Sequence, residues 1–356
     1  MSSEETKPFN TDPDELFEHF RVVVDKGQSL LRIDKFLSEK MQNASRNRLQ
    51  MALDSGSILV NEKPVKPNYK VKPEDVITIV LSYPHRDMEL ICEDIPLDII
   101  YEDESLLVVN KKAGMVVHPA YGNYKGTLVN ALAGHFNPGL IGQALKSETF
   151  RPGLAHRIDK NTSGLLVIAK SEDVLNNLSY QFYERTINRH YLALAWGDFK
   201  EEEGTITGHV GRNLADRKIM DVFPDGEHGK YAVTHYKVLE RFGYVTLVQC
   251  KLETGRTHQI RVHFQHIAHP LFGDFEYGGD RILRGTTSGK YKAFIENCFQ
   301  LMPRQALHAK SLGFIHPATN KEMYFEAPIP EDMEAVLARW RNYTSSIHRD
   351  VDQLDE

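Results

Sequence analysis

The chain has 356 residues, of which 41% are hydrophobic, and its 43 Lys and Arg against 49 Asp and Glu give a formal net charge of −6. This length suits two domains, and the composition is typical of a globular protein that buries a full core. No apolar run approaches the roughly 20 residues that span a bilayer, and the acidic N-terminus lacks the apolar segment of a secretory signal, so we expect neither a membrane partner nor secretion.

The cysteines are few, and no two of them have the spacing of a metal site: Cys92, Cys250 and Cys298. A small, odd number of widely separated cysteines favours a reducing compartment over a disulfide framework. We therefore expect a cytoplasmic protein.

Positive charge is concentrated in two blocks despite the acidic total. Residues 21–86 carry twelve Lys and Arg against seven Asp and Glu, and residues 106–170 carry eight against two. The excess acids lie in residues 1–20 and 87–105. Because binding to a polyanion depends on local fields, the total charge does not exclude a nucleic-acid partner. Ordinary fluctuation of charge along the chain explains the pattern equally well.

The first predicted elements form a small domain at residues 21–83, after an acidic tail at residues 1–20 that we expect to be disordered. The spacing of apolar residues predicts a helix within residues 30–41 and a second helix within residues 45–56. Residues 57–81 alternate β-forming residues with turn signals, which predicts short strands.

An acidic, proline-flanked linker at residues 84–96 leads to a second domain at residues 97–345, and a polar tail follows at residues 346–356. Strands are predicted at 106–110, 164–169, 190–196, 231–240, 244–252 and 321–326, and helices at 126–136, 171–184, 257–267 and 331–342. This mixed order, without regular βαβ alternation, favours an α+β domain with a mixed, largely antiparallel sheet flanked by helices and loops. Residues 137–150 and 273–306 are interpreted as insertions.

Asp159 is the residue whose surroundings suggest chemistry. It lies in the stretch GLAHRIDKNTSGLLVIAK, between Arg157 and Lys160. An isolated Asp most often caps a turn or forms a surface ion pair. As a catalytic group it must stay ionised in a partly dry pocket, which requires a nearby cation, and Arg157, Arg256 and Arg261 are the candidates. A lone carboxylate does not suit the paired acids of glycoside hydrolysis, but it suits a nucleophile or a proton abstractor that needs no metal or cofactor.

Two motif-like stretches do not support a metal or nucleotide site. His263, His266 and His269 do not share one tight face of a helix, and Pro270 ends that helix. The sequence GTTSGKY at residues 285–291 lacks the spacing of a phosphate-binding loop. We therefore expect no metal and no cofactor.

The sequences RIDKFLSEKM and SRNRLQMALDSGSILVNEKPVKPNYKVKPEDVITI cover nearly the whole small domain. They resemble the S4 RNA-binding domain, an α/β-type unit. The resemblance implies that the second helix, which begins SRNR, lies against structured RNA, and that Arg46 and Arg48 contact it.

Four stretches of the second domain carry a more specific likeness: NKKAGMVVHP, HRIDKNTSGLLVIAK, RHYLALAWG and LETGRTHQIRVH, in this order. Together they resemble the motifs of the RluA-type pseudouridine synthases, closest to the RluD branch, over residues 97–330. The resemblance implies an isomerase that converts specific uridines of structured RNA to pseudouridine, with large-subunit (23S) ribosomal RNA as the expected partner. It also implies that no cofactor is needed, because the reaction is redox-neutral and has no group donor.

The resemblance assigns roles residue by residue. Asp159 matches the catalytic aspartate, which either attacks the sugar or removes a sugar proton. Tyr191 matches the tyrosine that stacks on the target base, and Arg261 matches the arginine that keeps the aspartate charged and oriented. Arg157 matches the side chain that enters the space left by the flipped nucleotide.

Arg256, His258 and Lys160 are expected to shape the pocket or to contact the substrate. The sequence departs from the family pattern at four positions, Ile158, Asn161, Arg189 and Lys112. None of these positions belongs to the proposed chemistry, so the choice of target is more open than the activity.

Two other interpretations remain open: a non-catalytic RNA-binding or assembly factor, and a cofactor-free hydrolase of small nucleosides. The complete set of Asp159, Tyr191 and Arg261 disfavours the first, and the basic N-terminal domain disfavours the second. Ribosomal RNA is favoured over transfer RNA by the resemblance alone. We expect a monomer.

Overall fold

The computed structural model describes residues 17–41, 46–81, 90–119, 123–145, 153–214, 216, 219–287 and 289–352. Within these ranges the side chains of residues 17–19, 47, 48, 81, 144 and 347–352 lie outside the description. The chain divides into two compact units, Met1–Glu89 and Leu90–Glu356. No helix among the described residues is both long and apolar enough to cross a membrane.

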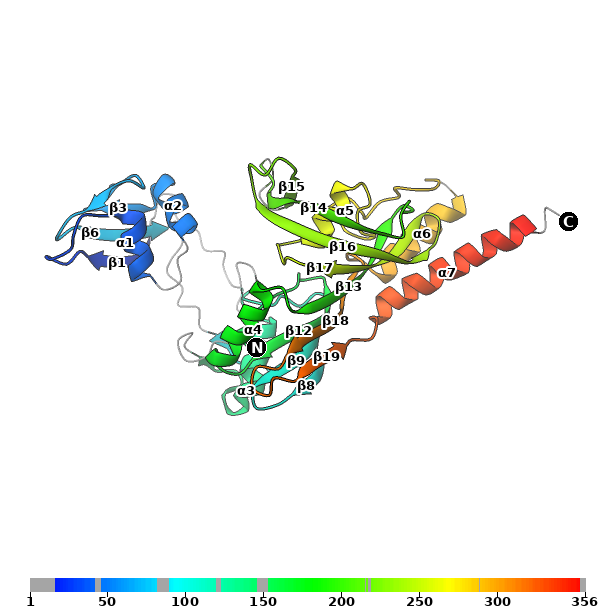
Figure 1. Cartoon of the computed structure of the whole chain (residues 1–356), viewed down its shortest axis with the longest axis horizontal. Coiled ribbons are helices and arrows are strands. Elements are labelled where there is room, and N and C mark those ends of the chain that lie inside the picture. Colours follow the sequence, from blue (N-terminus) through cyan, green and yellow to red (C-terminus); the bar gives the residue numbers. More distant parts are fainter. Residues whose placement is uncertain are drawn as a thin grey trace, which may run out of the picture. The chain divides into compact units, whose positions relative to one another are not determined.

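The first unit joins two helices to small antiparallel sheets (Figure 1). Its elements are β1 (Phe17–Val23), β2 (Leu31–Arg32), α1 (Ile33–Lys40), α2 (Arg46–Asp54), β3 (Ile58–Val60), β4 (Lys63–Pro64), β5 (Lys70–Val71) and β6 (Val76–Leu81). The larger sheet has the order β1-β6-β3-β4, and β2 pairs with β5. The apolar stripe of α1 packs its Ile33, Phe36 and Leu37 into the core of this unit.

The predicted tail, residues 1–20, and the predicted linker, residues 84–96, both include residues that belong to a folded unit at their C-terminal ends. Residues 17–20 belong to β1, because this strand pairs with β6 and Phe20 packs against the core of the first unit. Leu90–Ile91 forms strand β7, and Cys92 behind it is fully buried, so the linker does not extend to residue 96. Residues 1–16 and 82–89 lie outside the described part of the chain.

An 11-stranded sheet forms the framework of the second unit. The strands of this unit are β7 (Leu90–Ile91), β8 (Ile99–Glu102), β9 (Leu106–Lys111), β10 (Ala144–Leu145), β11 (Gly153–Leu154), β12 (Ser163–Ala169), β13 (Asn188–Trp196), β14 (Glu203–Arg212), β15 (Met220–Phe223), β16 (Lys230–Arg241), β17 (Val245–Leu252), β18 (Leu307–Ile315) and β19 (Glu322–Glu326). The order in the large sheet is β15-β14-β16-β17-β13-β18-β12-β9-β8, with β11 beside β12 and β19 beside β18.

Helices cover this sheet in separate places. They are α3 (Leu128–Phe136), α4 (Glu172–Tyr183), α5 (Gln259–His266), α6 (Gly289–Leu301) and α7 (Glu331–Asp352), with a 3-10 turn at Pro138–Leu140. Helix α5 packs against β14, β15 and β16, whereas α4 packs against β11 and β12 (Figure 1). This arrangement confirms the α+β class and the largely antiparallel sheet.

Each strand and helix predicted in the second domain has a counterpart that begins within a few residues of the predicted start. The sequence pattern did not predict β8, β10, β11, β14, β15, β18 and α6. The segment 273–306, interpreted as an insertion, contains α6, whose Tyr291, Ile295 and Cys298 are part of a hydrophobic core. The polar tail was also placed too early, since α7 continues to Asp352. Sequence period alone did not separate these elements from loops, because tertiary neighbours decide which face of each element is buried.

Strand β18 joins the two halves of the sheet. Among the described strand pairs, β12 and β18 form the parallel one, with Gly164 beside Ala309, while Ala309 also pairs with Tyr191 of β13. Gly164 has φ of +115°, and a Cβ there would lie 2.2 Å from the carbonyl oxygen of Ala309. The glycine therefore permits the close approach of the start of β12 to β18, which pairs with β13 on its other side.

We predict that Gly164→Ala destabilises the second unit by about 2–4 kcal/mol, because the new methyl group meets backbone and the residue keeps a left-handed φ. Thermal or denaturant unfolding followed by near-UV circular dichroism measures this loss. Gly139→Ala is the matched control, since a Cβ at Gly139 meets nothing within 4 Å. Equal stability of the two variants would contradict the role given to Gly164.

Candidate active site

A cavity of about 510 Å³ lies where the two halves of the large sheet meet. Its lining comes from the loop before β12, the end of α4, strand β13, and the turn between β17 and α5. Asp159, Tyr191 and Arg261 all line it, although they are far apart in the sequence. Small-molecule sites in proteins usually measure about 300–1,000 Å³, so one nucleoside is within its capacity.

Asp159 and Arg261 form an ion pair in this cavity. The Arg261 Nη1 donates to Asp159 Oδ2 at 3.3 Å, and the carboxylate keeps 20% of its side-chain surface exposed, whereas the guanidinium keeps 2%. The backbone carbonyl of Asp159 accepts from the amide of Thr162, which fixes the turn into β12. The carboxylate is thus reachable from the cavity while its cationic partner is buried.

Arg261 is oriented by acids that the sequence analysis did not identify. Its Nε and Nη2 each donate to Asp274 at 2.7 Å, and Nη2 also contacts Glu276. Burial alone would lower the pKa of Arg261, but the hydrogen bonds and charge of Asp274, with the charges of Asp159 and Glu276, raise it above its usual value. The bidentate pair with Asp274 leaves Nη1 free to face Asp159.

His258 lies near the other oxygen of the Asp159 carboxylate. Its Nδ1 is 2.9 Å from the Tyr277 hydroxyl, which also accepts a hydrogen bond from the amide of Met220, and its Nε2 is 3.9 Å from Asp159 Oδ1. Burial lowers the pKa of His258, while the charge of Asp159 opposes this change and Arg261 adds to it. His258 has φ of +54°, a left-handed conformation that turns the chain into α5.

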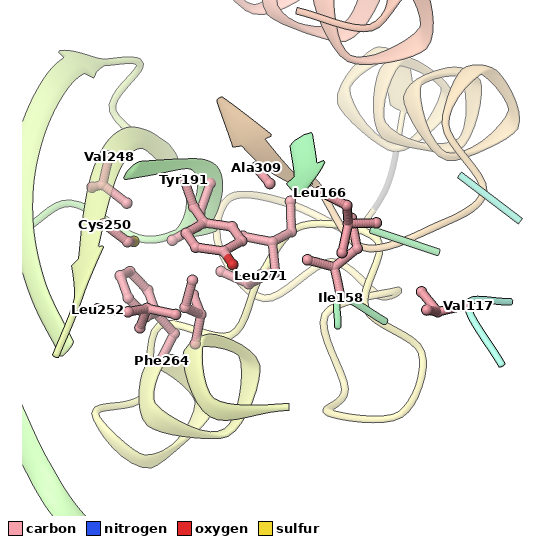
Figure 2. Packing of buried hydrophobic residues seen from close by; sticks show 14 of the residues in the cluster. Val117, Ile158, Leu166, Tyr191, Val248, Cys250, Leu252, Phe264, Leu271 and Ala309 are labelled. Carbon is pink, nitrogen blue, oxygen red and sulfur yellow. The ribbon is translucent and has the colours of Figure 1, made fainter. Parts of the chain in front are cut away.

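Tyr191 provides the apolar wall of the cavity. It is 6% exposed and packs in the cluster that contains Cys250, Leu252, Phe264 and Leu271 (Figure 2). A register shift against β18 occurs at this residue, and such bulges commonly aim a side chain toward a site. Burial raises the pKa of Tyr191, and the charge of Asp159 adds to this, so the phenol stays neutral at physiological pH.

The backbone after Asp159 is held by a buried lysine. Lys111, at the end of β9, is 2% exposed, and its Nζ donates to the carbonyls of Lys112, Met115 and Lys160 at 2.9, 2.9 and 3.0 Å. The three ammonium hydrogens therefore each have an acceptor. The loop after β9 is thereby tied to the loop that carries Asp159.

A buried arginine holds the next peptide of the same loop. The Nη1 of Arg304 donates to the carbonyl of Asn161 at 3.1 Å, and its Nε and Nη2 pair with Asp332 of α7 at 2.6 and 2.8 Å. Two consecutive carbonyls after Asp159 are thus fixed by basic side chains, one from the end of β9 and one from the segment before β18.

The remaining predicted site residues fall into two groups. Arg157, Arg256 and His258 line the cavity, with Arg157 exposed. The side chain of Lys160 does not, because it is exposed and donates to Asn123 at 3.3 Å. Arg46 belongs to the first unit, where it pairs with the fully buried Asp34 at 3.2 Å. Arg48 lies on α2, with its side chain outside the described part of the structure.

In the described ranges no three side chains of His, Cys, Asp or Glu come together in a way that could hold a metal ion. Burial lowers the pKa of His263 to about 4 and that of His308 to about 4, so both rings are neutral at physiological pH. The site's charges are those of carboxylates and guanidinium groups.

Comparison with known proteins places this site in a family. Residues 105–266 match the model of the RNA pseudouridylate synthases, and residues 31–77 match that of the S4 domain. An RNA pseudouridine synthase of Chlorobaculum parvum is 47% identical over 319 residues, which are 89% of this chain and 96% of that protein. The chain belongs to the RNA pseudouridine synthase family. The enzyme is therefore an isomerase whose partner is RNA.

Other relatives of this synthase are similar over most of its length. The protein named ribosomal large subunit pseudouridine synthase D in Neisseria meningitidis is 42% identical over 307 residues, which are 86% of this chain and 78% of that protein. The solved structure of human RNA pseudouridylate synthase domain containing 4 superposes with a TM-score of 0.51 at 23% identity, covering 68% of this chain and 92% of that chain. The structural likeness shows that the fold is shared.

Several residues of the synthase site were not identified from the sequence. Asp274 and Glu276 lie in FGDFEYGG, a stretch that the sequence analysis treated as part of an insertion. Lys111 lies in a stretch that it did single out, but no local pattern indicated a buried ammonium group. Gln259 closes the turn before α5. Its side-chain Nε2 donates to the carbonyl of Val233, and its Oε1 accepts from the backbone amide of Arg256. The sequence signal for Gln259 was a polar residue next to apolar positions of the predicted helix.

We predict that the stability difference between the wild type and Lys111→Met increases as the pH rises from 7 to about 10. Burial lowers the pKa of Lys111 from 10.5 to about 7, with Asp159 opposing and Arg304 adding to the change. In this window the unfolded chain binds a proton that the folded chain has lost, so the wild type gains up to about 1.4 kcal/mol per pH unit and the variant does not.

Denaturant unfolding at several pH values measures this difference. Val109→Ala, on the same strand, is the control, because it removes no titratable group and its stability difference should not change with pH. A Lys111→Met difference that is equally independent of pH would contradict the prediction.

Proposed function

We propose that this synthase isomerises specific uridines of large-subunit ribosomal RNA, with Asp159 as the catalytic group acting on a flipped-out nucleotide. The observation that carries the proposal is the pair formed by the reachable Asp159 carboxylate and the buried Arg261 guanidinium, 3.3 Å apart in the cavity. The buried guanidinium holds the carboxylate in one orientation at the edge of the cavity.

The reaction breaks the N1–C1′ bond of uridine and forms a C5–C1′ bond, with loss of the C5 proton and gain of a proton at N1. Asp159 acts on the ribose, either by attack on the sugar or by removal of a sugar proton. Both routes need an anionic carboxylate beside the sugar. Arg261 donates a hydrogen bond to one oxygen of this carboxylate, Oδ2 of Asp159. Neither route needs a redox partner or a group donor.

Base flipping is supported by the volume and lining of the cavity. The reacting bonds of a uridine are covered by its neighbours in a stacked strand, so enzymes that act on them take the nucleotide out of the stack. Tyr191 offers a buried aromatic face on which the base stacks. The exposed Arg157, two residues before Asp159, fills the space that the nucleotide leaves.

Two features support ribosomal RNA as the substrate. Relatives at 42% and 40% identity in Neisseria meningitidis and Nitrosomonas europaea are named ribosomal large subunit pseudouridine synthase D. The first unit matches the S4 domain, and α2 carries Arg46 and Arg48 near its start. We propose that these arginines contact phosphates of the RNA.

We predict that Asp159→Asn abolishes pseudouridine formation, at least about 10³-fold, without a change of fold, because the amide keeps the shape and loses the charge. Formation of the C5–C1′ bond displaces the C5 hydrogen, so tritium release from a large-subunit transcript labelled at uridine C5 measures the reaction. Asp280→Asn is the control, because Asp280 is exposed and outside the cavity lining.

Activity retained by Asp159→Asn would remove Asp159 from the chemistry. A wild type that binds the transcript but releases no tritium from it would exclude large-subunit RNA as the substrate. A factor without catalytic function would leave the transcript unmodified with every variant.

We predict that Arg46→Ala weakens RNA binding and lowers the slope of log affinity against log salt by roughly 0.7–0.9, the loss for one phosphate contact. Arg32→Ala is the matched control, since Arg32 and Arg46 both pair with the buried Asp34. Filter binding of the transcript at several salt concentrations measures both variants. Equal salt slopes for Arg46→Ala and Arg32→Ala would contradict a phosphate contact of Arg46. They would attribute the weaker binding to the lost pairing with Asp34, which affects the fold of the domain.

A further inference from the structure

Tyr183 is an unusual side chain at the cavity. Among the large hydrophobic side chains that the structure describes, it is the most exposed, at 79%, and no other exposed one lines the cavity. A ring that lines a cavity while most of its surface faces solvent must lie at the mouth. Exposed apolar side chains elsewhere on a surface are ordinary, but a tyrosine at the entrance of an active site is available to a substrate.

The segment that presents Tyr183 is packed against the cavity wall. Tyr183 is the last residue of α4, and Phe182 beside it packs on His156 with ring centroids 4.6 Å apart. The guanidinium carbon of Arg189 lies 5.0 Å from the centroid of the Phe182 ring. The end of α4 is therefore fixed to the cavity wall, so Tyr183 can bind a partner without first ordering the backbone.

Arg185 follows in a left-handed conformation, with φ of +59°. Helices usually place glycine at this position, because a Cβ makes it unfavourable. In the described part of the chain, Arg185 and His258 are the non-glycine residues of positive φ that line the cavity. Arg185 is half-exposed and pairs with Glu253 at 3.3 Å, an exposed ion pair that contributes little and can exchange for a phosphate.

The charge around the mouth fits an anionic strand. Five arginines line the cavity against two carboxylates, and Arg261 is already paired with acids behind it. The other four arginines are Arg157, Arg185, Arg189 and Arg256, of which Arg189 is buried. Arg157, Arg185 and Arg256 keep part of their surface exposed, in a chain whose formal net charge is −6.

We propose that Tyr183 and Arg185 form a second nucleotide site at the mouth of the cavity, which binds the nucleotide next to the target uridine in the RNA strand. The Tyr183 ring stacks on its base, and the Arg185 guanidinium binds its phosphate. Aromatic faces and arginines are the usual partners of unpaired nucleotides. The inference rests on the proposed RNA substrate of the cavity.

Tyr183→Ala should weaken binding of an unmodified large-subunit transcript about tenfold, as loss of one stacked base does, and leave its salt dependence unchanged. Tyr183→Phe keeps the ring and should stay within about twofold of the wild type. Tyr180→Ala is the matched control, because Tyr180 lies one turn earlier on α4, is 63% exposed and does not line the cavity. A loss with Tyr180→Ala equal to that with Tyr183→Ala would overturn the site.

Arg185→Gly separates binding from a structural role. Because glycine adopts the left-handed conformation freely, the melting temperature should be unchanged or higher, while the salt slope of binding falls by roughly 0.7. A lower melting temperature with an unchanged slope would show that Arg185 only caps α4. Binding is measured separately from tritium release, so failure of the ribosomal RNA proposal appears as binding without release and is distinguishable from failure of this site.

Discussion

The buried guanidinium of Arg261 is the group on which the site depends. It is 2% exposed and shared by Asp159, Asp274 and Glu276. Removing one partner of a buried ion pair leaves an uncompensated charge, which typically costs about 3–5 kcal/mol, so the cluster is stable only as a whole. The face of Tyr277 lies 4.9 Å from the guanidinium carbon and completes the enclosure. Among the three carboxylates of the cluster, Asp159 is the one that lines the cavity.

The cluster fixes the orientation of the Arg261 guanidinium. Asp274 occupies two of the guanidinium nitrogens with hydrogen bonds of 2.7 Å, so the direction of the remaining nitrogen is set before any substrate arrives. The loop that carries Asp159 is set independently, by Lys111 and Arg304 acting on its next two carbonyls. Preorganised charges of this kind stabilise a reacting group without reorganisation at the moment of reaction.

The large sheet provides the scaffold for these contacts. Strand β18 lies between β12 and β13, so the residue that faces Gly164 on one side faces Tyr191 on the other. Helix α5 then brings Arg261 to the same place from the far end of β17. Catalytic groups on a rigid framework and substrate-binding groups on helix ends and turns are a common division in enzymes.

The sequence by itself determined the two-domain plan, the α+β class, four helices and six strands of the second domain, and the identity of Asp159, Tyr191 and Arg261 as the residues to examine. These follow from local pattern or from motifs that keep their spacing along the chain. Only the tertiary structure decided that Asp274 and Lys111 belong to the site, that Lys160 lies outside the cavity, and that β18 and α6 are core elements. Those outcomes depend on pairings between residues many positions apart, and a one-dimensional pattern contains no distance between them.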